Sequence, residues 1–384
     1  MSRRLRLGMV GGGRGAFIGG VHRIAARIDG AWDLVAGALS SDPERAAASA
    51  ADLGIDPARS YAGFADMARA EAARPDGIDA VAIVTPNHMH VAPAIAFLQA
   101  GIHVICDKPL AAAMAEARAL ESAATSAGKL FILTHNYTGY PLIRQAREMV
   151  ARGDLGRIRS VHVEYAQDWL AEDIGAGNKQ ADWRTDPARA GGGAIGDIGT
   201  HALNLACYVT GEVPTHLAAE LSSFVSGRRV DDDAQVLLRY ASGARGMLWA
   251  SQIAVGHENG LRLRIYGERG GLDWAQESPN ALRFARIGAP AQILTRGGAG
   301  GTPAGLRHLR VPAGHPEGYL EAFATLYAEA AALIRAHDAG LPAPEHAHAP
   351  GIADGMLGMR FIAACLDSAA RDAGWVALWP GRKR

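Results

Sequence analysis

The stretch that decides the fold is residues 5–22, LRLGMVGGGRGAFIGGVH. Its first residues, Leu5–Val10, form a short and mainly apolar run, which predicts a buried strand. A glycine-rich turn follows, and an apolar helix then runs to about Asp29. A glycine-rich turn between a strand and a helix lets the backbone N–H groups at the helix start approach a phosphate closely. The stretch therefore predicts the opening unit of a dinucleotide-binding sheet.

The spacing of these glycines is irregular. Gly11 and Gly13 are followed by five residues before Gly19, whereas the usual dinucleotide-binding pattern has two residues there. Taken alone, the segment is also compatible with a flexible loop. The units that follow favour nucleotide binding, because they continue the alternation of strand and helix.

This alternation runs to residue 134 and is typical of a doubly wound parallel sheet. Asp42 and Pro43 are suited to cap and begin a helix. Ligands of such sheets bind at the carboxyl ends of the strands, where the glycine turn, Ser40, residues 85–87 and residues 107–109 are expected. We expect further strands at 34–39, 78–84, 103–106 and 130–134, and helices beginning at 43 and spanning 61–72 and 113–127.

The residue at the end of the second strand bears on the choice of nucleotide. An acidic residue there binds the ribose of NAD and repels the 2′-phosphate of NADP. Ser40 takes this place, and its hydroxyl can bond to a hydroxyl or to a phosphate. Arg45, which follows on the next helix, is either a phosphate contact or a solvated surface arginine. The sequence thus admits both NAD and NADP.

A second glycine-rich block, residues 191–201, has the sequence GGGAIGDIGTH. Three consecutive glycines allow the backbone to lie against another molecule, and the following residues predict a helix. Asp197 and His201 are four residues apart, so on a helix they share one face. The N-terminal end of a helix favours a neutral imidazole, which beside a carboxylate can act as a general base. A buried polar pair without a catalytic role is the alternative.

The rest of the chain predicts a different kind of sheet. A helix at 140–152 is followed by strands without intervening helices, a pattern that indicates a mainly antiparallel sheet. We expect a Rossmann domain at residues 1–137 and a second domain with a large open sheet at residues 138–384. The expected strands are 161–165, 217–224, 234–240, 245–253, 261–266 and 271–274, with final helices at 318–337 and 351–373.

Two clusters outside these motifs have both a plain and a functional interpretation. Trp169 and Trp183 lie near Arg184 and either stack on a sugar or polyol ring or close a core. The run Asp231–Asp233 lacks the spacing of a calcium loop, so we expect a solvated turn there. We expect no metal site.

The composition excludes several partner classes. The chain has 384 residues, and its 39 lysines and arginines balance its 39 aspartates and glutamates, so no overall charge points to nucleic acid or to a membrane surface. Its three cysteines are widely spaced, which is typical of reduced cysteines in a cytoplasmic protein. The apolar stretch after Met1 is too short for a signal peptide or a membrane span.

Several motifs together resemble the Gfo/Idh/MocA oxidoreductase family. They are the glycine turn with His22 on the following helix, the Thr-Pro-Asn-x-x-His segment at 85–90, the acidic-Lys-Pro tripeptide at 107–109 and the GGG-x-x-x-D-x-x-x-H block. The resemblance implies hydride transfer between NAD or NADP and a secondary alcohol of a cyclic polyol, sugar or glycoside. Two departures stand out: Asp107 replaces the usual glutamate, and Arg14–Ile18 lengthens the glycine turn by three residues.

The resemblance and the pattern together give a set of expected site residues. The catalytic residues are Lys108, Asp197 and His201. The cofactor-binding residues are Gly11, Gly13, Gly15, Phe17, Ile18, Ser40, Arg45, Thr85, Pro86, Asn87, His90, Asp107 and Lys108. The substrate-binding residues are Lys108, Asn136, Tyr137, Trp183, Arg184, Asp197 and His201.

The resemblance leaves other activities open. A tightly bound nucleotide could cycle between two sugars or assist glycoside cleavage, and the family also contains a nucleotide-binding regulator without turnover. The presence of Lys108, Asp197 and His201 argues against the regulator. The family further implies a homo-oligomer, a dimer or tetramer, that pairs through the sheet of the second domain.

Overall fold

The computed structural model describes residues 3–173 and 179–379, apart from the side chains of residues 179, 180, 182 and 188. The chain divides into two compact units. The first comprises Met1–Gly139 and Tyr319–Met356, and the second comprises Tyr140–Gly318 and Leu357–Arg384. The sequence had placed everything after residue 137 in the second domain, so the structure assigns Tyr319–Met356 differently.

The first unit contains a five-stranded sheet in the order β2-β1-β3-β4-β5, and every pairing in it is parallel. The strand order reverses between β1 and β3, which is the switch point where such sheets bind ligands. The expected doubly wound parallel sheet is confirmed. Its strands are β1 (Leu5–Gly11), β2 (Trp32–Ala38), β3 (Ala80–Val84), β4 (His103–Cys106) and β5 (Phe131–Leu133).

Helices connect these strands. Asp42 caps α2 as expected, since its carboxylate accepts a hydrogen bond of 2.8 Å from the backbone N–H of Arg45, and Pro43 is the first helical residue. Short 3-10 turns follow β3 and β5 at Asn87–Met89 and Asn136–Gly139. The helices are α1 (Phe17–Ile28), α2 (Pro43–Asp52), α3 (Phe64–Ala73), α4 (Val91–Gln99) and α5 (Met114–Ala127).

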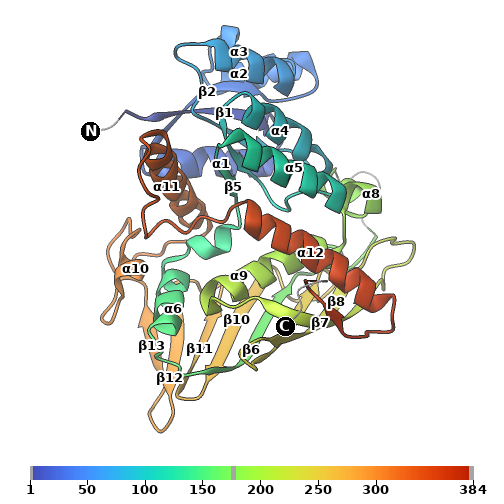
Figure 1. Cartoon of the computed structure of the whole chain (residues 1–384), viewed down its shortest axis with the longest axis vertical. Coiled ribbons are helices and arrows are strands. Elements are labelled where there is room, and N and C mark those ends of the chain that lie inside the picture. Colours follow the sequence, from blue (N-terminus) through green and yellow to red (C-terminus); the bar gives the residue numbers. More distant parts are fainter. Residues whose placement is uncertain (1–2, 174–178, 380–384) are drawn as a thin grey trace. The chain divides into compact units, whose positions relative to one another are not determined.

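Helix α11 (Tyr319–Asp338) completes the core of the first unit and lies beside α1 (Figure 1). Phe323, Tyr327 and Ile334 are buried in the same apolar cluster as Leu7 and Ala25. Trp32 on β2 donates its indole N–H to the backbone oxygen of Tyr327 at 2.9 Å. These contacts explain why the segment from Tyr319 belongs to the first unit.

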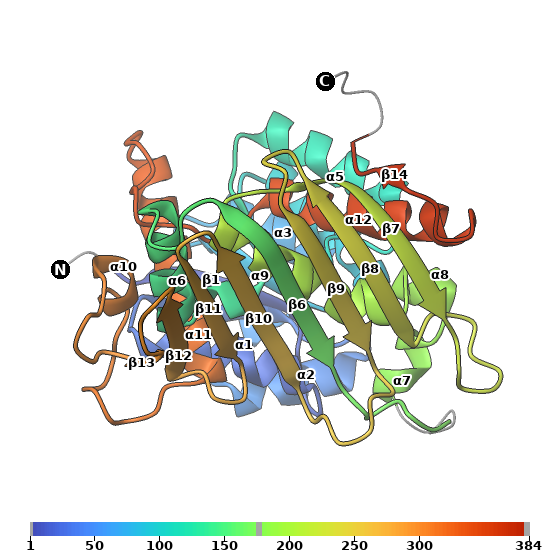
Figure 2. The same ribbon diagram turned by 90° about the horizontal axis from the view of Figure 1, so that it is seen from below.

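The second unit contains a nine-stranded sheet in the order β13-β12-β11-β10-β6-β9-β8-β7-β14 (Figure 2). Its pairings are antiparallel except for the parallel pair β6–β9, so the expected mainly antiparallel sheet is confirmed. The sequence did not predict β12, β13 or β14. The strands are β6 (Ile158–Ala166), β7 (Pro214–Ser222), β8 (Asp233–Tyr240), β9 (Arg245–Ser251), β10 (Gly260–Gly267), β11 (Gly270–Ala275), β12 (Ala281–Arg286), β13 (Gln292–Thr295) and β14 (Val376–Ala377).

One face of this sheet is covered by helix and the other is open. Helix α9 (Thr200–Thr210) packs on β6, β9 and β10, and Figure 2 looks onto the opposite face. Burial alternates accordingly: Val236 and Leu238 on β8 are buried, whereas Leu237 between them is exposed. The other helices are α6 (Pro141–Ala151), α7 (Lys179–Arg184), α8 (Pro187–Ala190), α10 (Pro303–Leu306) and α12 (Ile352–Ala369), which starts in the first unit's segment and ends in the second's.

Candidate active site

The glycine turn after β1 has the backbone geometry of an anion-binding loop. Gly11, Gly12 and Gly15 have φ values of 78°, 73° and 79°, a left-handed conformation that glycine adopts readily. Ala16 precedes α1 and has no side-chain oxygen to cap the helix, so the first N–H groups of α1 suit an external anion. The turn, together with Ser49 and Asp52 of α2, lines a cavity of about 430 Å³. These features fit the pyrophosphate of a dinucleotide.

Residues of the enlarged turn divide into exposed and packed ones. Phe17 is exposed, and Ile18 packs against the core of the first unit. The guanidinium of Arg14 binds both carboxylate oxygens of Asp52, at 2.5 and 2.7 Å. A Cβ on Gly13 would lie 2.7 Å from the backbone oxygen of Leu39. Gly13 is therefore needed for packing within the chain itself, whatever its approach to a nucleotide.

The loop after β2 holds Ser40 in a short turn. Its hydroxyl oxygen accepts a hydrogen bond of 3.1 Å from the backbone N–H of Asp42. The same hydroxyl can also donate, so it retains the capacity to bond a ribose hydroxyl or a phosphate oxygen. Arg45 lies exposed on the first turn of α2.

The loops after β3 and β4 are tied together by His90. Its ring nitrogens lie 2.8 Å from two backbone oxygens, those of Thr85 and Pro109. Burial lowers the pKa of His90, although Asp107 and the two carbonyl groups act in the opposite direction. The ring is fully buried. His90 was expected to bind the cofactor, and its observed contacts are instead with the backbone of the two loops that carry Thr85 and Lys108.

Asp107 and Lys108 sit at the carboxyl end of β4. The Asp107 carboxylate accepts hydrogen bonds from the backbone N–H of Lys108 at 3.0 Å and from the Thr134 hydroxyl at 2.9 Å. Lys108 is half-buried. Burial, and to a lesser degree the nearby Lys108 ammonium, lower the pKa of His135 to about 3, which keeps that imidazole neutral. The shorter side chain of Asp107 thus still anchors the lysine-bearing loop.

Residues Asn136 and Tyr137 belong to the 3-10 turn after β5 and are both buried. The Tyr137 ring lies 6.4 Å from the ring of Tyr319, centroid to centroid. The amide nitrogen of Asn136 has no hydrogen-bond partner among the described residues. A buried donor without a partner is costly, so this amide is suited to bind a ligand oxygen.

In the second unit, the Asp197 carboxylate accepts hydrogen bonds from the side chains of Arg184 and Gln252. Its Oδ2 atom accepts hydrogen bonds from Nε of Arg184 at 3.1 Å and from Nε2 of Gln252 at 3.0 Å. The Arg184 guanidinium also lies 4.1 Å above the ring centre of Trp183 and 5.8 Å from that of Trp169. Trp183 is buried. Arg184 is thereby fixed between an aromatic ring and the carboxylate to which it donates.

The helix that carries Asp197 and His201 starts differently from the sequence prediction. Ile195–Gly199 forms a π-helical turn, and α9 continues from it at Thr200. Helical backbone begins at Ala194, so His201 lies about two turns from its start, where the effect of the helix dipole has largely decayed. The dipole effect that the sequence predicts for His201 should therefore be weak. π-turns commonly occur at functional sites.

The surroundings of His201 include polar side chains that sequence reasoning missed. His201 is buried, and its ring lies 6.2 Å from that of Tyr165 on β6. The Tyr165 hydroxyl and the Gln167 amide both donate to Oδ1 of Asn259, each at 2.8 Å. These residues, and Gln252, come from strand ends distant in sequence, and no local motif marks them.

The run Asp231–Asp233 is not the solvated turn expected from the sequence. Asp231 and Asp232 are both buried, because their carboxylates accept backbone N–H groups. Asp233 accepts the indole N–H of Trp249 at 2.9 Å. The run looked solvated because its acceptors find their donors only after folding.

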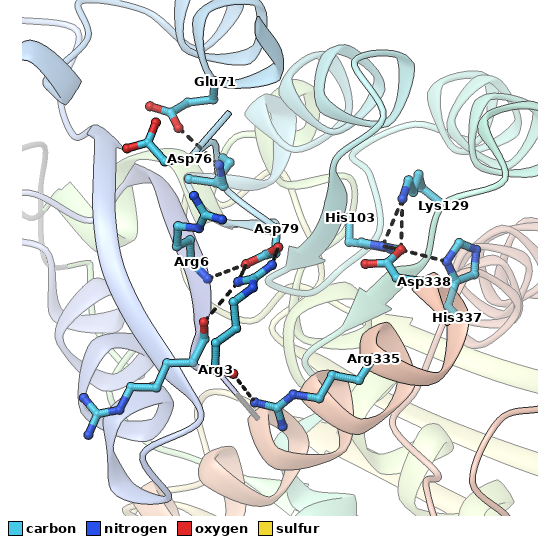
Figure 3. Close-up of polar contacts among 12 residues, drawn as sticks. Arg3, Arg6, Glu71, Asp76, Asp79, His103, Lys129, Arg335, His337 and Asp338 are labelled. Carbon is cyan, nitrogen blue, oxygen red and sulfur yellow. Dashed lines mark hydrogen bonds and ion pairs between the residues drawn. The ribbon is translucent and has the colours of Figure 1, made fainter. Parts of the chain in front are cut away.

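One group within the described ranges has ligand atoms close enough for a metal ion: His103, His337 and Asp338, with these atoms within 4.8 Å of one another (Figure 3). The backbone N–H of Leu130 donates to Nδ1 of His103, which leaves the ring hydrogen on Nε2, pointing at Asp338. Burial raises the pKa of Asp338, but hydrogen bonds from His103, His337 and Lys129 outweigh it and lower this pKa to about 2. These hydrogen bonds connect the end of α11 to β4 of the sheet.

Comparison with known proteins defines the class and then the family. A parallel sheet with a glycine turn before α1 defines a dinucleotide-binding fold, and residues 5–146 match the model of the oxidoreductase family with an NAD-binding Rossmann fold. Residues 143–273 match the GFO/IDH/MocA C-terminal domain. The chain belongs to the Gfo/Idh/MocA family and is an NAD-binding oxidoreductase.

Solved structures similar to the chain span its length. An oxidoreductase from Sinorhizobium meliloti is 54% identical, with a TM-score of 0.90 over 98% of this chain and 100% of that one. An inositol dehydrogenase homologue from Azotobacter vinelandii, in complex with NAD⁺, is 39% identical, with a TM-score of 0.94 over 98% of both chains. An inositol dehydrogenase homologue from the same organism, 38% identical to this chain, has been solved with NADH and myo-inositol.

A further relative acts on an anhydrosugar. Levoglucosan dehydrogenase of Pseudarthrobacter phenanthrenivorans is 30% identical over 97% of this chain and 98% of its own length. Levoglucosan dehydrogenase in complex with NADH and levoglucosan has a TM-score of 0.83 at 29% identity, over 98% of this chain and 100% of that one. Within the described part of this chain, no helix has the length and apolar character that a membrane span requires.

Proposed function

We propose that this protein is an NAD(P)-dependent dehydrogenase that interconverts a secondary alcohol and a ketone on a cyclic polyol, sugar or glycoside. The observation that carries the proposal is the Asp197 carboxylate, fixed by Arg184 and Gln252 on the helical segment that leads to the buried His201. A fixed carboxylate and an imidazole on one helix are the components of a general base. The relatives that bind myo-inositol or levoglucosan support the substrate class.

The proposed roles divide between the two units. When bound, the nicotinamide cofactor supplies the hydride acceptor or donor. His201 takes the hydroxyl proton during oxidation, and Asp197 orients the imidazole and favours its cationic form. Lys108 bonds to the reacting oxygen as negative charge develops there. We assign nucleotide binding to the first domain, and substrate binding and oligomerisation to the second.

The residue types proposed for the substrate site support a substrate with several hydroxyl groups. Asn136, Tyr137 and Arg184 would complete the substrate contacts, with Trp183 acting through the guanidinium that it supports. A site built to pair several hydroxyls rejects analogues that leave its polar groups unpaired, by roughly 10⁴-fold. Simple aliphatic alcohols should therefore be very poor substrates.

The remaining proposals concern nucleotide, assembly and compartment. Ser40 lets the protein accept either NAD or NADP, since no carboxylate stands at that position to repel a 2′-phosphate. The open face of the second sheet, with exposed Leu237, Met247 and Ile293, is the proposed contact of a homodimer or tetramer. The free Cys106, Cys207 and Cys365 suit the reducing cytoplasm.

Steady-state production of NADH and NADPH across a panel of cyclitols, aldoses, anhydrosugars and aliphatic alcohols tests the function. His201→Ala and Lys108→Ala should each lower turnover by roughly 10²- to 10⁴-fold, with nucleotide affinity by calorimetry nearly unchanged. His216→Ala, which alters a half-buried histidine on β7, serves as the control. Near-wild-type turnover in both active-site variants would refute the assignment.

The same assay separates the rival activities. Net release of reduced nucleotide supports a dehydrogenase, whereas a nucleotide that stays bound while two sugars exchange oxidation state, or while a glycoside is cleaved, supports internal cycling. Nucleotide binding without turnover on any member of the panel would favour a regulator.

A further inference from the structure

A buried carboxylate from a distant loop holds the start of the helix that carries Asp197 and His201. Asp231 precedes β8, and its two oxygens accept hydrogen bonds from the backbone N–H groups of Gly193 at 2.8 Å and Ile195 at 2.7 Å. Its backbone oxygen accepts the N–H of Ala194 at 2.9 Å. Three successive N–H groups of the block are thus bound by one residue.

The peptide unit between Gly193 and Ala194 links Asp231 to Asp197. The backbone oxygen of Gly193 accepts the N–H of Asp197 at 2.9 Å and that of Gly196 at 3.1 Å. A Cβ on Gly193 would lie 1.7 Å from the backbone oxygen of Asp231, so only glycine allows this approach. The position of the Asp197 backbone is therefore linked directly to Asp231.

The neighbouring peptide supports the side chain of Asp197. The backbone oxygen of Asp232 accepts the N–H of Gln252 at 2.9 Å, and the Gln252 amide donates to Oδ2 of Asp197. The segment Asp231–Asp232 thus supports Asp197 in two ways. It acts on the Asp197 backbone through Gly193, and on the Asp197 carboxylate through Gln252. Neither aspartate is in position to be an exposed surface charge, since both are buried.

We propose that Asp231 is a positioning residue for the reaction, which fixes the π-turn so that Asp197 keeps its geometry toward His201. This inference rests on the proposed dehydrogenase function. The ionised carboxylate suits this role, because both of its oxygens are charged acceptors and neither carries a hydrogen. Burial raises the pKa of Asp231, and the hydrogen bonds from Ile195 and Gly193 oppose the rise.

Asp231→Asn tests the proposal, because the amide keeps the shape but turns one acceptor into a donor that faces a backbone N–H. We expect kcat to fall roughly 10- to 100-fold, the effect of a small misplacement of catalytic groups. KM for the nucleotide should stay near the wild-type value, and the pH profile of kcat should shift. The control is Glu317→Gln, another buried carboxylate of the second unit, whose Oε1 atom accepts the backbone N–H groups of Arg310 and Val311 and pairs with Arg296.

A purely structural role predicts that both variants lose activity in proportion to their loss of thermal stability. The proposal predicts that kcat and its pH profile are altered only in Asp231→Asn, whatever the loss of thermal stability in either variant. If the amide variant does not fold, Asp231→Ser retains one acceptor in a smaller side chain and should show the same pattern. An unchanged kcat and pH profile in a folded Asp231 variant overturns the inference.

Hydrogen–deuterium exchange separates this inference from the proposed function. Exchange of the amides at residues 193–201 should quicken on the order of tenfold or more in Asp231→Asn, and Glu317→Gln should leave it unchanged. A wild-type protein without turnover on any substrate contradicts the proposed function, while the exchange still tests whether Asp231 holds the block. Unchanged exchange in Asp231→Asn contradicts the inference whatever the substrate.

Discussion

Two glycine-rich turns, at residues 11–15 and 191–193, each lead into a helix, and Gly15 and Gly193 in them illustrate two different needs for glycine. In the first, Gly11, Gly12 and Gly15 adopt positive φ, and a Cβ on Gly15 would meet no atom within 4 Å. In the second, Gly193 is required because the backbone of Asp231 lies against it. Gly15 uses the conformational freedom of glycine to shape a loop, whereas Gly193 uses its small size to bring two segments together.

The largest effect should come from adding a methyl group to the second turn. Gly193→Ala would force apart the Gly193 and Asp231 backbones and displace Asp197, so we expect turnover to fall by roughly 10²- to 10³-fold. Nucleotide affinity should change little, since that site belongs to the other unit. Steady-state kinetics and calorimetry measure the two effects. Gly192→Ala, whose Cβ would lie 3.3 Å from its nearest neighbour, Cα of Gly196, is the milder control. Wild-type turnover in Gly193→Ala would show that this contact is unimportant.

Acid should lower the stability of the protein through His22, which lies on α1 after the turn at residues 11–15. This ring is fully buried on α1, and its Nδ1 lies 2.8 Å from the Tyr327 hydroxyl. Burial lowers the pKa of His22 to about 4, from 6.5. The contribution of neutral His22 to the free energy of unfolding is fully present above pH 6.5. It falls as the pH drops to 4, because the unfolded chain binds the proton more tightly. The total loss in the free energy of unfolding is about 3 kcal/mol.

His22→Gln removes this titration and retains a polar partner for Tyr327. The free energy of unfolding, measured with denaturant at pH 7, 6, 5 and 4, should decline with acid in both proteins. The decline should be smaller in the variant by about 3 kcal/mol. Other groups titrate equally in both proteins, so the difference between the two curves is the measured quantity. Parallel curves would mean that His22 is not held neutral in the folded state.

The smallest effect should come from the first turn itself. Gly12→Ala places a Cβ 2.8 Å from the Val84 side chain in a backbone with φ of 73°, and we expect about a tenfold loss of nucleotide affinity as the loop distorts. Gly20→Ala is the control on α1, since the nearest atom to its Cβ would be 3.9 Å away. It should bind nucleotide normally and gain about 0.5–1 kcal/mol of stability. Calorimetric titration with NADH that gave equal affinities would remove the turn from the binding site.

Much of the first unit could be predicted from the sequence, because local signals fixed its elements. Asp42 and Pro43 marked the start of α2, and short apolar runs marked the strands to within a few residues. The partner of α11 could not be predicted. The packing of Phe323 and Tyr327 against α1 and β2 depends on contacts across about three hundred residues of chain.

The candidate site was predicted only where a motif carried it. Asp197 and His201 stood out by their spacing, whereas Gln252 and Asp231 act through hydrogen bonds to residues 55 and 36–38 positions away. The π-turn was also hidden, and Asp231, which accepts the N–H group of its first residue, is distant in the sequence. The strands Ala281–Arg286 and Gln292–Thr295 were missed because each is short.

The first unit is not a continuous piece of chain, and this affects how it can fold during synthesis. Domains commonly fold from the N-terminus as they leave the ribosome. Residues 1–139 emerge without α11, so the apolar side of α1 that will meet Phe323 and Tyr327 has no cover. The nucleotide-binding half can therefore complete its core only after the whole stretch Tyr140–Gly318 has been made. A late segment of the nascent chain closes its earliest part.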